Sequence, residues 1–153
     1  MQRIFNELKQ GEYDALYESL PSSSRARFSR ERFTSALQRT HDFYRLERME
    51  IGAVRVAGEL AVVDTVMYAH ISRPVEGDRK IELDGKLVVQ QYLVKEDGTW
   101  RVAIGDRAIT ERFLKSNPSF ARKFPIKRPR TFIKQNGSWV EFPLGKPRTG
   151  PQK

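Results

Sequence analysis

KIELDGKLVVQQYLVKEDGTWRVAIGDRA, residues 80–108, carries the clearest strand and turn signals in the chain. Apolar and polar residues alternate on both sides of the Asp97-Gly98 pair. Alternation with a period of two predicts strands, and Asp-Gly between two such runs predicts a tight hairpin, because a type I′ turn needs positive φ at both central residues. We therefore expect two long antiparallel strands, Lys80 to Lys95 and Thr99 to Ala108.

Helical periodicity precedes these strands. Apolar residues recur every three or four positions in two short pieces within residues 1–20, which Gly11 separates. The same spacing continues from Arg30 to Tyr44, where Ser29 is a suitable N-cap because its hydroxyl oxygen can accept a hydrogen bond from a free helix N–H. The first third of the chain is therefore expected to be helical.

The period changes to two after this helix, which predicts further strands at Met49 to Val56 and at Leu60 to Ser72. Gly85 lies inside the third strand and suggests a bulge or bend there. Four successive strands with short connections favour an antiparallel meander. The fold class is therefore α+β, with N-terminal helices packed on a curved antiparallel meander sheet.

The C-terminal part is an extension of this unit. Ile109 to Leu114 is expected to form a short helix, and Thr131 to Phe142 repeats the hairpin pattern around Asn136-Gly137. The last residues mix glycine, proline and basic residues and are expected to be disordered. The predicted organisation is a main domain at 1–115, a basic extension with a short hairpin at 116–143, and a disordered tail at 144–153.

The charge of the chain is concentrated near its C-terminus. The 153 residues carry a net charge of +9, but residues 1–119 hold 19 basic and 18 acidic side chains, whereas residues 120–153 hold 9 basic and 1 acidic. The chain has no cysteine, which excludes disulfides, thiolate metal sites and a cysteine nucleophile. No apolar run is long enough to span a membrane.

Three segments carry a resemblance to a known superfamily. They are the opening GEYDALYESLP at residues 11–21, the helix that carries Phe33 and Leu37, and the hairpin EDGTWRV at residues 96–102. Over roughly residues 1–115 the order of these elements resembles the nuclear transport factor 2-like superfamily, which has the cystatin-like cone fold. The resemblance implies a cone with a pocket at its open end.

That superfamily includes isomerase-, dehydratase- and cyclase-like enzymes as well as binding proteins without catalysis. Its enzymes need an acid or base positioned inside the pocket, and no catalytic motif of the superfamily matches this chain residue by residue. The resemblance therefore leaves both an enzyme and a binding module open.

Polar residues on the predicted strands are the candidates for a site in such a pocket. They are Asp64, Tyr68, His70, Gln91 and Asp106. An aspartate in an apolar cavity can have a raised pKa and act as a base, and a nearby tyrosine or histidine can polarise a carbonyl. Because a slip of one residue turns every side chain to the other face, exposed positions and surface ion pairs are the alternative. The ligand-binding set that we expect is Tyr68, His70, Gln91 and Asp106, with no catalytic residue assigned.

No metal or cofactor is expected. The chain has two histidines, His41 and His70, far apart in sequence and outside any His-Glu-x-x-His spacing. A glycine-rich phosphate loop and a nucleophile-elbow motif are absent from the sequence.

Residues 122–134 interleave basic side chains with prolines and aromatic rings. Such a segment can neutralise the phosphates of nucleic acid or of an anionic membrane surface, and it can equally be a solvated linker. Contact with an anionic partner is therefore a minor hypothesis.

The main functional hypothesis is a non-catalytic module that binds a small apolar ligand or another protein. The alternative is an isomerase-, dehydratase- or cyclase-like enzyme that acts on a small apolar substrate. A homodimer is expected through an apolar strand face, formed by Ala61, Val63, Met67, Ala69 and Ile71. The sequence leaves the compartment open between export, with a signal or anchor upstream of residue 1, and the cytoplasm.

Overall fold

A computed structural model describes residues 1–75, 77–103, 107–125 and 127–142. Four helices open the chain: α1 (Gln2–Gln10), α2 (Tyr13–Glu18), α3 (Ser22–Arg27) and α4 (Arg30–His41). Four strands follow: β1 (Tyr44–Ala57), β2 (Leu60–Pro74), β3 (Lys80–Glu96) and β4 (Thr99–Val102). The described chain ends with α5 (Arg107–Ser116), α6 (Pro118–Lys123), β5 (Arg130–Gln135) and β6 (Ser138–Phe142).

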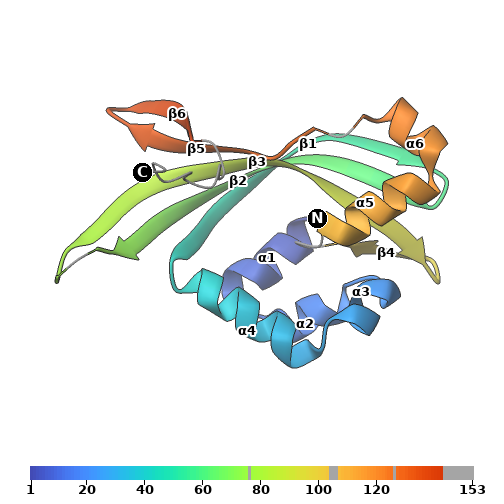
Figure 1. Ribbon diagram of the computed structural model, residues 1–153, viewed down its shortest axis with the longest axis horizontal. Coiled ribbons are helices and arrows are strands. Elements are labelled where there is room, and N and C mark those ends of the chain that lie inside the picture. Colours follow the sequence, from blue (N-terminus) through green and yellow to red (C-terminus); the bar gives the residue numbers. More distant parts are fainter. Residues whose placement is uncertain (76, 104–106, 126, 143–153) are drawn as a thin grey trace, which may run out of the picture.

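The predicted fold class is confirmed. Helices α1 to α4 lie together on one side of a curved, open, antiparallel sheet, and the β5–β6 hairpin stands at the opposite end of the sheet from α6 (Figure 1). The strand order is β1-β2-β3-β5-β6, and β4 pairs with β3. The C-terminal hairpin thus continues the main sheet, because β5 pairs with β3 from Gly85 to Val88.

Strand β3 organises this sheet because it is paired along both edges. Its 17 residues pair with β2 from Lys80 to Val94 on one edge. The other edge holds β4 near its C-terminal end and β5 in its N-terminal half. The predicted strand from Thr99 to Ala108 was too long: β4 stops at Val102, and α5 begins at Arg107. Strand β5 pairs with part of the β3 edge that β4 does not cover.

Both predicted hairpin turns are confirmed. Asp97 and Gly98 have φ of 48° and 75°, and Asn136 and Gly137 have φ of 49° and 79°. Positive φ at both central positions is the type I′ requirement, which asparagine and aspartate tolerate better than most residues and glycine meets without steric cost.

The N-terminal helices follow their predicted start and stop signals. Ser29 Oγ accepts a hydrogen bond from Arg32 N at 3.2 Å, and Gly11 ends α1 in the left-handed conformation. Helix α4 ends at His41, three residues before the predicted end, because the chain enters β1 at Tyr44.

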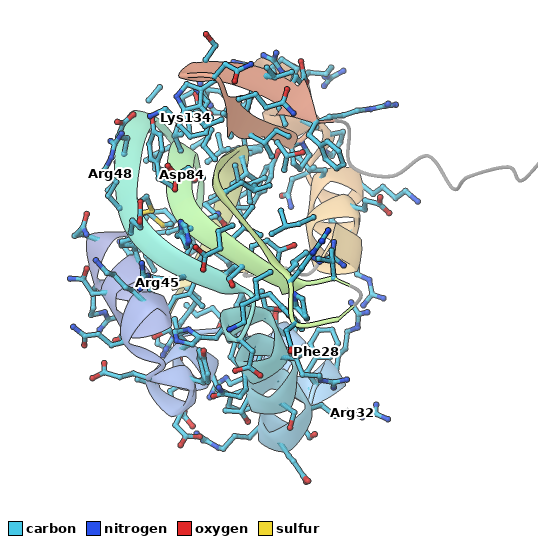
Figure 2. The ribbon with its side chains drawn as sticks, turned by 90° about the vertical axis from the view of Figure 1, so that its left-hand side faces the viewer. Phe28, Arg32, Arg45, Arg48, Asp84 and Lys134 are labelled. Atoms are coloured by element: carbon cyan, nitrogen blue, oxygen red, sulfur yellow. The ribbon has the colours of Figure 1, made fainter. Side chains whose placement is uncertain are left out.

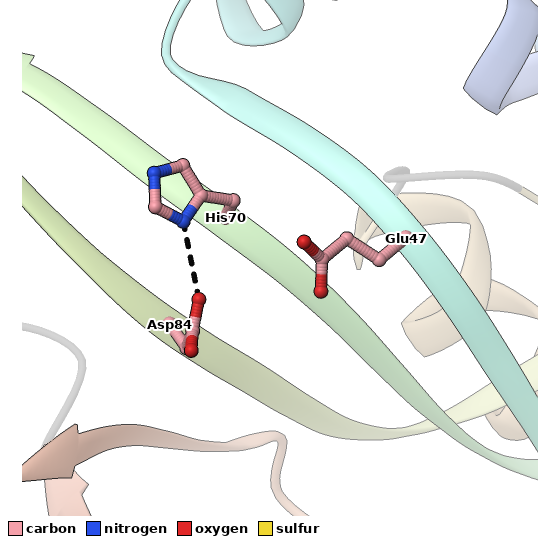
Figure 3. Close-up of side chains that lie close together, drawn as sticks. All are labelled: Glu47, His70 and Asp84. Atoms are coloured by element: carbon pink, nitrogen blue, oxygen red, sulfur yellow. Dashed lines mark hydrogen bonds and ion pairs between the residues drawn. The ribbon is translucent and has the colours of Figure 1, made fainter.

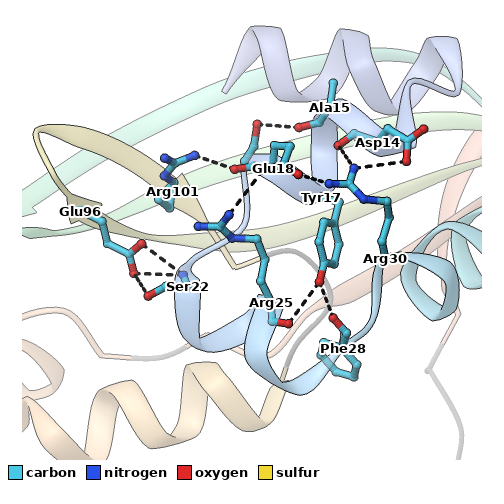
Figure 4. Close-up of polar contacts among 11 residues, drawn as sticks. Asp14, Ala15, Tyr17, Glu18, Ser22, Arg25, Phe28, Arg30, Glu96 and Arg101 are labelled. Carbon is cyan, nitrogen blue, oxygen red and sulfur yellow. Dashed lines mark hydrogen bonds and ion pairs between the residues drawn. The ribbon is translucent and has the colours of Figure 1, made fainter.

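Helix α3 was not predicted, and its start depends on a residue distant in sequence. The Glu96 carboxylate, beside the β3–β4 turn, accepts hydrogen bonds from the backbone N–H and the hydroxyl of Ser22 (Figure 4). Arg101 on β4 donates to the carbonyl of Glu18 at 2.6 Å. These contacts hold the α2–α3 connection against the end of the central hairpin. No local pattern in the sequence predicts them.

The sheet is buried on both faces at this end. Ala61 and Val63 face α1 and α2 in a core with Leu16, and Val62 faces the other way in a second core with Phe120 of α6. Side chains that alternate along β2 therefore enter two different cores, which explains a continuous apolar run at the start of the strand.

The double burial predicts a difference between two valines. Val62 is 1% exposed and Val54 is 58% exposed. Val62→Ala should lower the free energy of unfolding by about 2 kcal/mol, because it removes two buried methyl groups and leaves a void. Val54→Ala makes the same chemical change on β1 and should cost less than about 0.5 kcal/mol. Equal losses in equilibrium urea unfolding would contradict a packed α5–α6 layer on this face.

Candidate functional site

A cavity of about 530 Å³ lies between the sheet and helices α1, α2 and α4. Alternating residues of the two central strands form its floor: Met67, Ala69 and Ile71 from β2, and Leu83, Gly85 and Leu87 from β3. We call this side of the sheet the cavity face and the opposite side, which carries Tyr68, His70 and Asp84, the outer face. Leu8, Tyr13 and Leu37 of the helices close the cavity on its inner side.

Gly85 allows close packing in the floor of the cavity. The bulge predicted at this residue is wrong, since β2 and β3 pair without a register shift through Ala69 and Gly85. A Cβ atom at Gly85 would lie 2.7 Å from Cδ1 of Ile71 and 3.6 Å from the carbonyl oxygen of Phe132. The glycine therefore leaves room for the Ile71 side chain beside it, which is a close-approach role.

The mouth of the cavity, on the cavity face of the sheet, is open to solvent and carries a positive charge. Tyr44 and Phe142 are 39% and 56% exposed there. Arg73, near the end of β2, is exposed, lines the cavity and makes no ion pair with any described residue. No aspartate or glutamate occurs among the described residues that line the cavity. The cavity is thus apolar along its floor and cationic at its mouth.

Two further polar side chains line the wall formed by the helices. The Tyr13 and His41 rings meet edge to face, with centroids 6.2 Å apart. Burial, and secondarily the negative charge of Asp42, raises the pKa of Tyr13, so its hydroxyl stays protonated at neutral pH.

The ammonium group of Lys86 faces the outer side of the sheet. It lies over the rings of Phe132 and Trp139, at 4.9 and 4.8 Å from their centroids. Lys86 is also among the residues that line the cavity, but its ammonium group is engaged with these two rings.

The structure does not bring the predicted ligand-binding residues together. Tyr68 and His70 point to the outer face, so the expectation that they face the pocket is wrong. Gln91 pairs with Val63 on the helix-bearing side but does not line the cavity. Asp106 lies outside the described residues. The side chains that do line the cavity are mostly apolar, and sequence reasoning had treated several of them as a surface for dimerisation.

Tyr68 is engaged on the outer face instead. The Arg48 guanidinium lies 3.6 Å from the centroid of the Tyr68 ring, and Arg48 is also paired with Glu50. The ring of Trp139 meets Tyr68 edge to face at 5.9 Å. Figure 2 places Arg48 and Asp84 on the sheet and Lys134 on the C-terminal hairpin, at the end of the molecule away from Phe28 and Arg32.

Asp64 is an ion-pair partner rather than a general base. Arg55 Nη2 lies 2.6 Å from its Oδ1, and Gln90 makes a longer contact of 3.5 Å. The hydrogen bond from Arg55 lowers the pKa of Asp64, with burial acting in the opposite direction. A raised pKa, which the catalytic hypothesis required, is therefore contradicted for this residue.

The apolar face proposed for a homodimer is covered within the chain. Ala61 and Val63 are each 4% exposed beneath the N-terminal helices, and Met67, Ala69 and Ile71 form the cavity floor. The inner part of this face is therefore buried within one chain, and a homodimer stays a prediction.

Part of the basic segment 122–134 is already engaged. Arg130 forms a two-pronged ion pair with Glu141, with contacts of 3.0 and 2.9 Å. Lys134 lies over the ring of Trp139. Contact with nucleic acid or an anionic membrane surface stays a prediction.

One group of side chains has the composition of a metal site. Glu47, His70 and Asp84 place one potential donor atom each within 4.8 Å of the others on the outer face (Figure 3). His70 Nδ1 lies 3.1 Å from Asp84 Oδ1. Sequence reasoning missed this group because its members come from three different strands.

Neither a protein-family model nor a curated protein matches the chain. Within the described residues, the helices are all too short or too polar to cross a membrane. The cavity and the outer-face cluster therefore have to be interpreted from their own chemistry.

The Arg55–Asp64 pair predicts a pH-dependent contribution to stability. Because the pKa of Asp64 is lowered in the folded state, the stabilisation is present above the pKa of an unfolded aspartate, about 4, and is lost as the pH falls through the folded value. Asp64→Asn should lower the free energy of unfolding by about 1 kcal/mol at pH 7, a modest value since both side chains remain partly solvated.

Urea unfolding across this pH range is the measurement. Asp78→Asn removes an exposed aspartate and is the matched control, for which we expect no change. A loss at Asp64→Asn that stays constant from neutral to acidic pH would contradict the ion-pair explanation.

Proposed function

We propose that the protein binds an elongated amphiphile, a long-chain carboxylate, in the cavity without transforming it. The observation that carries this proposal is the combination of an apolar floor, a cationic mouth and the absence of acidic side chains among the described lining residues. An apolar chain would be buried along the floor, and its carboxylate would remain at the mouth beside Arg73.

The dimensions support an elongated ligand. The floor follows β2 from Met67 to Arg73, and the six residue-to-residue steps between them span about 20 Å at the rise of a strand. The volume of about 530 Å³ falls within the range usual for small-molecule sites. Each methylene group buried in such a cavity contributes about 0.8 kcal/mol, so a long chain supplies most of the affinity.

Charge complementarity supports an anionic head group. The Arg73 guanidinium has no ion-pair partner among the described residues, and its planar fork matches the two oxygens of a carboxylate. A neutral or cationic head would leave this charge without compensation. The carboxylate is therefore the head group that the mouth of the cavity favours.

Binding without catalysis is supported by what lines the cavity. His41 is the one imidazole among the described lining residues, and it packs against Tyr13 with no carboxylate among those residues to orient it. Asp64, Tyr68 and His70 lie on the other face of the sheet. The order of the helices and strands also supports our proposal that the chain is a non-enzymatic member of the nuclear transport factor 2-like superfamily.

Filling the cavity should abolish binding. Ala69 lies in the middle of the floor, and Ala69→Phe would occupy the path of the alkyl chain. Isothermal titration with palmitate should give one site per chain in the unaltered protein and at least about tenfold weaker binding in this variant. Ala53→Phe makes the same change at an exposed position of β1 and should bind like the unaltered protein.

Two further experiments distinguish the contribution of the ligand's alkyl chain from that of its head group. Affinity should fall by about tenfold or more for each pair of methylenes removed in the series palmitate, laurate and octanoate. Arg73→Gln should weaken palmitate but leave hexadecanol unaffected, because the alcohol carries no charge. Equal binding by folded Ala69→Phe would overturn the proposed site, and equal binding of palmitate by Arg73→Gln would overturn the proposed head group.

A further inference from the structure

We propose that Glu47, His70 and Asp84 bind a divalent transition-metal ion such as Zn²⁺ on the outer face of the sheet. One donor atom from each side chain lies within 4.8 Å of the other two. This site is on the opposite side of the sheet from the cavity, and the inference does not depend on the proposed ligand.

Strand pairing brings the three side chains into one row. His70 of β2 and Asp84 of β3 are directly opposite each other in the register, so their side chains share a face. The neighbouring strand β1 has a register shift between Leu46 and Arg48, which makes Glu47 the extra residue of a bulge. A bulge re-aims a side chain out of strict alternation, and Glu47 here points to the same face as His70 (Figure 3).

The bulge is held in place from outside the sheet. The Lys9 ammonium group of α1 donates to the backbone carbonyl of Glu47 at 2.7 Å. This contact fixes the backbone at the bulge while it leaves the carboxylate of Glu47 free to turn. The position of the first ligand is therefore set by α1, and those of the other two are set by the β2–β3 ladder.

The donor set suits zinc-like ions. One imidazole nitrogen and two carboxylate oxygens are borderline-to-hard ligands, and three protein ligands with water in the fourth position are a common arrangement for Zn²⁺. At bond lengths of about 2.0 to 2.2 Å, donors around a tetrahedral ion lie about 3.3 to 3.6 Å apart. His70 Nδ1 and Asp84 Oδ1, at 3.1 Å, are already close to this spacing. The carboxylate oxygen of the exposed Glu47 side chain lies within 4.8 Å of the other two donors, so a shift of about 1 Å brings it to this spacing.

Most basic side chains near the proposed metal site interact with other residues. Arg48 is paired with Glu50 and stacked on Tyr68, and the Lys86 ammonium lies over two aromatic rings. Arg45 is the exception, since it stands opposite His70 in the β1–β2 register. It reduces the negative potential at the site, and we therefore expect selectivity for ions that bind imidazole over Ca²⁺ and Mg²⁺.

A simple His70–Asp84 ion pair with an uninvolved Glu47 is the competing explanation. The two explanations differ in what Glu47 does. A metal site needs all three side chains, whereas an ion pair ignores Glu47 and takes up no metal.

The test is a titration of the untagged protein with Zn²⁺, followed by calorimetry, and with Co²⁺, followed by its visible absorption. We expect one ion per chain and, for Co²⁺, absorption bands typical of low coordination number. His70→Ala, Asp84→Asn and Glu47→Gln should each weaken Zn²⁺ binding by more than about tenfold. Glu82→Gln removes the next acidic residue along β3 and should bind Zn²⁺ like the unaltered protein.

Several outcomes would overturn the proposal. One is the absence of saturable binding below about 1 mM Zn²⁺. Another is that Glu47→Gln binds Zn²⁺ as tightly as the unaltered protein. The third is loss of Zn²⁺ binding in His41→Gln, which alters the other histidine of the chain. The glutamine and asparagine variants are close to isosteric, so they test the site even where His70→Ala fails to fold. Circular dichroism of each variant establishes that it is folded before titration.

Discussion

Strand β3 is hydrogen-bonded to other strands along both of its edges, and this pairing determines the path of the chain. A strand of 17 residues exposes more backbone donors and acceptors than one partner can satisfy, and β2 satisfies one edge only. The other edge is shared between β4 and β5, which are separated in the chain by α5 and α6. The chain therefore leaves the sheet after Val102 and returns to it at Arg130. Between these points, α5 and α6 form the layer that buries Val62 and Tyr92.

This arrangement divides the sheet into two regions with different surroundings. Near the β3–β4 turn, helices cover both faces and the side chains form two cores. Toward the β5–β6 hairpin, the N-terminal helices no longer reach the floor, and the same alternation that fills the core leaves a cavity. The contacts of Glu96 with Ser22 and of Arg101 with Glu18 fasten the helices to the first region (Figure 4). The position of the cavity is thus a consequence of where the helices are attached.

Local signals in the sequence were sufficient for the fold class, and long-range contacts limited the rest. The Asp97-Gly98 and Asn136-Gly137 turns and the Ser29 cap depend on neighbouring residues and were predicted correctly. Helix α3 depends on Glu96, 74 residues away from Ser22, and was missed. The end of β4 was misplaced because the apolar pattern after Val102 fits either a strand or the approach to a helix. The hairpin within the extension was predicted, but no feature of residues 130–135 indicates that they pair with β3.

The candidate site shows why alternation alone does not locate function. Alternation grouped Met67, Ala69 and Ile71 on one face and Tyr68 and His70 on the other, and this grouping is correct. Which face the helices cover is a tertiary property, and polarity suggested the wrong one, because polar residues were expected to point into a pocket. Successive residues such as Ala69 and His70 therefore belong to different surfaces, one apolar and one charged, on opposite sides of the same sheet. A single strand can in this way support two sites whose chemistry is independent, since the backbone of the sheet separates their side chains.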